Sequence, residues 1–186
     1  MIRIEVERMK TKTTIFLLTA LLLLVSCQHQ TIQDVILKEN YDSSDIKELV
    51  EILSVNDVND YEAVITSTQL IITTKDHRDM IYDLPDDEFF VSVAPYIHET
   101  HPCTNHVLTS CQGELVNEDF EVTIVDEQGD IVVHGTFNSG SNGFIDLWLP
   151  RNKAFQIEIK HEEKQVISEI STFEHDGTCL TTMQLT

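Results

Sequence analysis

The chain has 186 residues, with 32 acidic against 12 basic side chains and a formal net charge of −20 at pH 7. This charge repels nucleic acid and anionic surfaces, so we expect no nucleic-acid ligand. The length suffices for one domain or two small ones. The sequence contains no G-x-S-x-G, H-E-x-x-H or glycine-rich phosphate loop, which argues against a hydrolase.

The N-terminus has the features of an export signal. Lys10 and Lys12 precede an apolar run over residues 13–25, which is short for a membrane-spanning helix and typical of a secretory signal. The tetrapeptide L-V-S-C resembles a bacterial lipobox, in which the cysteine, here Cys27, is lipidated. We therefore predict that residues 1–26 are a lipoprotein signal peptide. The mature protein would be extracytoplasmic and lipid-anchored to the bacterial cell membrane, and an uncleaved anchor helix is the alternative.

Residues 27–85 are predicted to form a small N-terminal region of helices and a β-hairpin. Two short helices are expected over residues 32–37 and 45–53. The second has four apolar residues spaced for one helix face, namely Ile46, Leu49, Val50 and Leu53. Residues 63–74 are rich in β-branched side chains, and residues 80–84 can return as a further strand.

Residues 86–186 are predicted to form a second domain, built from short strands with turn signals between them. The predicted strands cover residues 89–97, 120–125, 131–137, 144–149, 155–160, 166–173 and 178–185. This spacing is typical of an antiparallel sandwich of the immunoglobulin or transthyretin kind. The predicted fold is therefore α+β, with a small helical N-terminal region followed by a mainly antiparallel β-sandwich.

Sulfur and nitrogen donors gather between His98 and Cys111, where the chain carries two cysteines and three histidines. Seven residues separate Cys103 from Cys111, enough for the loop to fold back and bring both sulfurs together. Cys179, at the start of the last predicted strand, can reach the same end of a sandwich, where loops cluster. We therefore predict a three-thiolate metal site in residues 86–186, with two histidines as further candidate ligands. These histidines are His101 and His106.

The ligand types leave the metal open. Thiolates select Cu(I), whereas three cysteines with one histidine would suit Zn²⁺ equally well. Without the lipidated cysteine the chain has an odd number of cysteines, which indicates a reactive thiol, an intermolecular bridge or metal ligation. The alternative is a structural or adhesive lipoprotein in which a Cys103–Cys111 disulfide only closes a loop. Met183 alternates with leucines and is assigned to the core.

Three separate blocks resemble the CueP family of periplasmic copper-resistance proteins. They are T-H-P-C-T-x-H-x-x-T-x-C-Q-G-E-L at 100–115, G-F-I-D-L-W-L-P-R at 143–151 and T-C-L-T-T-M-Q-L at 178–185. The resemblance implies an envelope protein whose three cysteines ligate or exchange Cu(I). It also implies a homodimer formed through the N-terminal region. The lipobox departs from the better-known members and implies a tethered protein.

We accordingly expect a copper-binding protein for copper tolerance, which sequesters Cu(I) or passes it to a client. Its expected partners are a copper donor or client protein, the membrane through the lipid anchor, and a thiol-disulfide reductase that keeps the thiols reduced. We do not expect an enzyme. Two of the thiols could reduce Cu(II) or Fe(III) as they form a disulfide, and this role would be stoichiometric.

Overall fold

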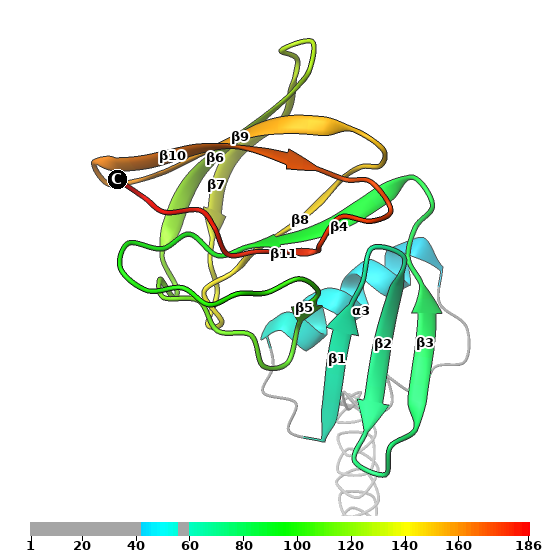
Figure 1. Ribbon diagram of the computed structural model, residues 1–186. Helices are drawn as coiled ribbons and strands as arrows, with labels where there is room; N and C mark the ends of the chain where they lie inside the picture. The colour runs from blue at the N-terminus through cyan, green and yellow to red at the C-terminus, as the bar shows by residue number, and fades with distance from the viewer. Residues whose placement is uncertain (1–41, 56–59) are drawn as a thin grey trace, which may run out of the picture. The chain divides into compact units, whose positions relative to one another are not determined.

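The computed structural model of the chain describes residues 42–55 and 60–186 (Figure 1). All of them belong to one compact unit, residues 39–186. The signal segment, Cys27 and the helix predicted over residues 32–37 lie outside the described residues. Within the described part of the chain, no helix is long and apolar enough to cross a membrane.

Helix α3, Ser43–Val55, covers the second predicted helix and extends it by two residues at each end. At its start, the carboxylate of Asp42 accepts a hydrogen bond from the N–H of Asp45 at 3.0 Å, which satisfies one of the free donors of the first turn. The four apolar residues that the sequence places on one face are all buried. The helix is therefore stabilised by what covers this face rather than by its own short length.

The first sheet has the strand order β3-β2-β1-β5. Its strands are β1 Tyr61–Ile65, β2 Gln69–Thr74, β3 Asp79–Asp83 and β5 His106–Val107. The β-branched stretch over residues 63–74 folds as a hairpin, because the hydroxyl of Thr66 accepts the N–H of Gln69 at 2.9 Å and closes a tight turn. The two-residue strand β5 was not predicted, because so short a segment carries no periodicity.

The other two sheets share one hydrophobic core. One sheet has the order β10-β9-β6-β7 and the other the order β11-β4-β8. Their strands are β4 Glu88–Val93, β6 Asp119–Asp126, β7 Ile131–Asn138, β8 Ile145–Pro150, β9 Ala154–His161, β10 Lys164–Ser171 and β11 Cys179–Leu180. The core contains apolar residues of β4, β6, β8 and β9 together with Met183, which confirms the core assignment of that methionine.

The described residues thus form mostly antiparallel β-structure with one short helix, as the sequence predicts in outline. Two predicted strands are shorter in the structure, since residues 89–97 contain β4 only up to Val93 and residues 178–185 contain only β11. β11 pairs with β4 in parallel, which local patterns could not show. The likeness to immunoglobulin or transthyretin sandwiches stays a prediction. The domain boundary placed between residues 85 and 86 also stays a prediction, and β5 from beyond it pairs with β1 from before it.

Candidate metal centre

Three sulfur atoms that are far apart in the sequence meet at one point. The Sγ atoms of Cys103, Cys111 and Cys179 all lie within 4.8 Å of one another. Cys103 follows β4, Cys111 follows β5 and Cys179 opens β11, so three different segments supply the three sulfurs. The loop spacing predicted this convergence. Among the described residues, the three cysteines form a group that could hold a metal ion.

The cluster is partly oxidised. Cys103 and Cys179 form a disulfide, and Cys111 is a free cysteine whose Sγ lies 3.8 Å from that of Cys103. The alternative of a Cys103–Cys111 disulfide is therefore wrong for this structure. The reason lies in the loop packing, because the backbone N–H of Cys179 donates to the carbonyl of Thr104 at 3.1 Å and holds Cys179 against the Cys103 segment.

A glycine makes this close approach possible. A Cβ atom at Gly177 would stand 2.7 Å from the carbonyl oxygen of Thr104, a distance that side chains do not tolerate. The absence of a side chain therefore lets the 177–179 segment lie on the loop of Cys103. Gly177 stands two residues before Cys179. The sequence did not predict its role, because this role depends on contact with the loop of Thr104, which is distant in the chain.

Cys111 is held by the edge of β5. The carbonyl of Val107 accepts the N–H of Cys111 at 2.9 Å, and the N–H of Val107 donates to the Cys111 sulfur at 3.4 Å. Burial raises the pKa of the Cys111 thiol, and the Val107 N–H lowers it by less. The thiol consequently stays protonated at neutral pH until an electrophile or a metal ion displaces its proton.

The cluster has an apolar floor. Cys179 packs with Ala94 and Phe144, all three are nearly fully buried, and Cys103 and Cys111 pack against them. Such a floor shields one side of the sulfur cluster from water, which favours a soft, weakly hydrated ligand over a hard hydrated cation.

His106 lies beside the sulfurs in the interior. Its side chain is 0 % exposed, its Nδ1 lies 3.6 Å from the Cys179 sulfur, and its ring packs near Phe144 with centroids 4.4 Å apart. Its Nε2 is buried without a hydrogen-bond partner among the described residues. Burial lowers the pKa of His106 to about 4, with a smaller contribution from His101. The imidazole is therefore neutral at physiological pH, the form that binds metals.

The other candidate histidine is placed differently. His101 is only partly buried, and its Nδ1 lies 3.4 Å from the carbonyl oxygen of Pro102. Its ring centroid lies 6.5 Å from that of Phe144. His106 is thus in contact with the sulfur cluster, whereas the structure places His101 beside the same phenylalanine without a contact to a sulfur among those described.

Two residues that position the site were missed. The carboxylate of Glu114 accepts the backbone N–H groups of Ile97 and His98, at 2.5 and 3.0 Å, and so fixes the segment that leads to Cys103. Thr178 donates its hydroxyl to the carbonyl of Ile65 at 2.6 Å and accepts the N–H of His106 at 2.9 Å. Both residues stand inside the cysteine-containing motifs, but their partners lie on other segments, so only the tertiary structure reveals the contacts.

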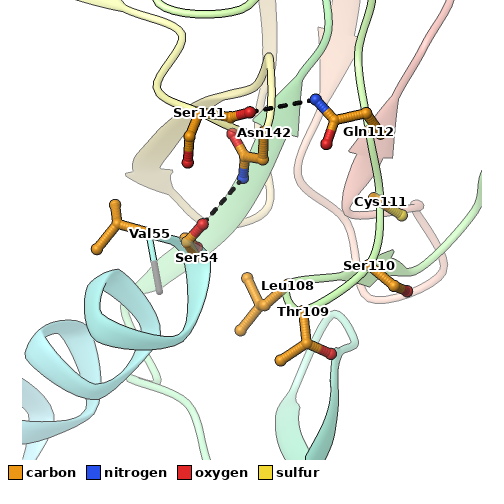
Figure 2. Close-up of a pocket in the computed structure, with 9 residues that line it drawn as sticks. All are labelled: Ser54, Val55, Leu108, Thr109, Ser110, Cys111, Gln112, Ser141 and Asn142. Carbon is orange, nitrogen blue, oxygen red and sulfur yellow. Dashed lines mark hydrogen bonds between the residues drawn. The ribbon is translucent and has the colours of Figure 1, made fainter. Parts of the chain in front are cut away.

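A pocket of about 250 Å³ opens beside the free thiol (Figure 2). Cys111 forms part of its wall, and most of the other lining side chains are small and polar. The end of α3 forms the opposite wall, where the Asn142 amide donates to the carbonyl of Ser54 at 3.3 Å. The Cys111 side of the cluster is therefore open to solvent, in contrast to the buried Cys179 side.

Two of the comparisons with known proteins found matches. The family described as "Periplasmic copper-binding protein CueP" matches residues 45–184. A solved structure named "Crystal Structure of S.CueP" is 35% identical to this chain and superimposes with a TM-score of 0.72. The match covers 76% of this chain and 88% of that chain. None of the curated proteins matches this chain.

Proposed function

Since this chain belongs to the CueP family of periplasmic copper-binding proteins, we propose that it holds Cu(I) at the thiolates of Cys103, Cys111 and Cys179 for copper tolerance. The observation that carries the proposal is the convergence of the three sulfurs within 4.8 Å. Thiolates are the ligands that Cu(I) prefers, and no hard oxygen ligand belongs to this group of described residues.

The sulfur spacing fits one ion. With metal–sulfur bonds of about 2.3 Å, three sulfurs around a trigonal ion stand about 4 Å apart. The 3.8 Å between the sulfurs of Cys103 and Cys111 already has this value. Once the Cys103–Cys179 disulfide is reduced, these two sulfurs are no longer bonded to each other and can separate toward the same spacing.

The disulfide supports a redox role linked to binding. Reduction of the Cys103–Cys179 disulfide takes two electrons and two protons and yields two thiols, which join the free thiol of Cys111 as the proposed copper ligands. Run in reverse, two thiols pass two electrons to two Cu(II) ions, which gives two Cu(I), one disulfide and two released protons. This second candidate function is stoichiometric, since each turnover consumes the dithiol, so we propose no enzyme. A thiol-disulfide reductase would be needed to restore it.

Zinc remains the alternative metal. His106 could complete a set of three cysteines and one histidine, because its Nδ1 lies 3.6 Å from the Cys179 sulfur and its pKa keeps it neutral. A role as an adhesive or structural lipoprotein is less well supported, because the disulfide on which it depended is not the one that forms.

The setting of this chemistry is also part of the proposal. We propose an extracytoplasmic protein, tethered to the bacterial cell membrane through a lipid on Cys27, which receives copper from a donor or passes it to a client. The L-V-S-C sequence supports the tether and the CueP family supports the compartment. Formation of a homodimer is proposed from the family resemblance alone.

The test is an anaerobic titration of the fully reduced chain with Cu(I) against a chromogenic chelator. The wild type should compete for one equivalent of Cu(I), and Cys111→Ser and Cys179→Ser should each lose most of that competition. His106→Ala probes the fourth-ligand position, with His134→Ala as its control on the distant strand β7. Parallel titration with Zn²⁺ distinguishes the two metals.

Three outcomes would contradict the proposal. One is a wild type that does not compete with the chelator, and another is a Cys179→Ser variant that competes as well as the wild type. The third is tighter retention of Zn²⁺ than of Cu(I) at equal free-metal concentration, which would favour the zinc alternative.

A further inference from the structure

One face of the first sheet carries an apolar row that crosses all four strands. The register pairs Ile81 of β3 with Ile71 of β2, and Ile71 with Val64 of β1. Val64 pairs in turn with Val107 of β5. Because directly opposed residues point to the same face, the four side chains form one line. Ile81 is 56 % exposed and the other three are partly exposed.

The opposite face of this sheet is buried, which fixes the apolar row as the open side. The residues that flank Val64 along β1 and Ile71 along β2 point to that buried face. They are Ala63, Ile65, Leu70 and Ile72, and each is 0 % exposed. Figure 1 shows α3 crossing this sheet, with β1, β2 and β3 side by side. A sheet with one buried and one open face normally carries polar residues on the open one. An aliphatic row on the open face therefore indicates a surface that a partner covers.

Carboxylates border this row on both sides. On one side Asp79 accepts the hydroxyl of Thr73 at 2.8 Å, and Glu62 lies opposite Thr73 in the register. On the other side Asp83 accepts the amide of Gln69 at 3.1 Å. No strand position in register with these residues on the open face carries lysine or arginine.

The row ends at the metal centre. Val107 is its last member, and both backbone groups of Val107 bond to Cys111, its N–H to the sulfur at 3.4 Å and its carbonyl to the Cys111 N–H at 2.9 Å. Cys111 therefore lies where the next strand of the sheet would lie. A molecule that covered the apolar row would reach Cys111, the free cysteine of the cluster.

We propose that this surface, the acidic docking face, binds a partner protein with an apolar centre and a lysine- or arginine-rich rim, which exchanges Cu(I) at Cys111. The face consists of Ile81, Ile71, Val64 and Val107, with Glu62, Asp79 and Asp83 as its rim. The inference rests on the proposed function, because it assigns the route by which copper reaches or leaves that site.

The charge selects this occupant over a second copy of the chain. A second copy on this face would bring the two carboxylate rims together, so the proposed homodimer would form through another surface of the N-terminal region. An anionic lipid surface is repelled for the same reason. A cationic partner is attracted, and electrostatic steering of this kind raises association rates by about 10- to 1,000-fold at low ionic strength.

The test uses two synthetic helical peptides as Cu(I) donors. Both carry a leucine face and a terminal Cys-x-x-Cys that holds Cu(I), and they differ only in having lysine or glutamate along the flanks. Stopped-flow absorbance measures copper transfer to the reduced full chain. The lysine peptide should transfer at least about tenfold faster at low ionic strength, and this advantage should shrink as salt is added.

Variants locate the effect. Asp79→Lys/Asp83→Lys should abolish the advantage of the lysine peptide, and Ile81→Ser should weaken binding of the metal-free lysine peptide severalfold in fluorescence anisotropy. Ile167→Ser is the matched control, because Ile167 is 53 % exposed on β10 of another sheet and should change neither measurement.

Each outcome supports or overturns the docking face. Equal transfer rates for the two peptides, or an advantage that survives in the charge-reversal variant, overturns it. A wild-type dimer that Ile81→Ser dissociates also overturns it, since the face then belongs to a second copy. Equilibrium retention of Cu(I) is measured with the same proteins. Retention without peptide preference refutes the docking face alone, and loss of retention refutes the proposed function.

Discussion

Acidification should destabilise the copper-free protein through His106. In the folded chain, burial lowers the pKa of this imidazole from 6.5 to about 4. The unfolded chain therefore binds more protons than the folded chain between these two values. By linkage, the stability that the neutral buried imidazole contributes is fully present above pH 6.5 and is lost as the pH falls toward 4.

The size of the effect follows from the two pKa values. Between about pH 7 and pH 4.5, a group with these values lowers the free energy of unfolding by about 2 to 3 kcal/mol. This is a large fraction of the roughly 5–15 kcal/mol that stabilises a typical domain. Other groups titrate over the same range, so the effect of His106 must be isolated by difference.

The assay is urea unfolding of the oxidised, metal-free full chain at several pH values, for the wild type and for His106→Phe. Phenylalanine keeps an aromatic ring against Phe144 but cannot be protonated. The difference in unfolding free energy between the two proteins should move by about 2 to 3 kcal/mol in favour of the variant as the pH falls from about 7 to about 4.5. His134→Phe, at an exposed position on β7, should show no such shift. A difference that is flat with pH would refute the reasoning.

Three further perturbations probe the loops, the buried carboxylate and the joint between sheets. Gly177→Ala should cost about 1–3 kcal/mol of unfolding free energy and slow re-formation of the disulfide in a thiol count, because the new Cβ meets the carbonyl of Thr104. Burial raises the pKa of Asp146, so its contribution to stability is lost as the pH rises through that pKa. The free energy of unfolding of Asp146→Asn relative to the wild type, measured in urea, should therefore increase as the pH rises from about 4 to about 7. Arg151 donates to the carbonyls of three residues, Ser67 among them, and Arg151→Lys should cost about 1–3 kcal/mol in thermal or urea unfolding.

Matched substitutions make these results interpretable. Gly135→Ala should be mild, because its Cβ would meet only a ring carbon of Phe137 at 3.6 Å. Arg78→Lys should leave the free energy of unfolding close to the wild-type value, since Arg78 belongs to an exposed ion pair with Asp76. If Gly135→Ala costs as much as Gly177→Ala, crowding against a carbonyl is not the cause of the loss. If Arg78→Lys costs as much as Arg151→Lys, the contacts of Arg151 with the three carbonyls are not the cause either. An Asp146→Asn difference that does not change with pH would contradict the role of the buried carboxyl.

Much of the chain could be predicted because its local patterns agree with its environment. The offsets of three and four in residues 45–53 indicate a buried helix face, and α3 buries those residues. The alternation in β6 and β9 likewise matches the buried residues of both strands. The three cysteines, with His101 and His106, could be named as candidate ligands from their chemistry and their place in the loops, and the structure brings the three sulfurs together. Local patterns did not predict the bounds of the shortest strands. β5 and β11 have two residues each and are defined only by their pairing with the strands beside them.

The amino-acid sequence by itself determined which side chains are available for the site: three soft sulfurs, a nearby histidine and a strongly acidic surface, together with the family likeness carried by its motifs. Only the tertiary structure decided which cysteines pair and which stays free, because pairing depends on the contact between the 177–179 segment and the carbonyl of Thr104. Only the tertiary structure also decided that the open face of the first sheet leads to Cys111. Both depend on contacts between segments distant in the chain, and neither hydrophobic periodicity nor residue spacing encodes such contacts.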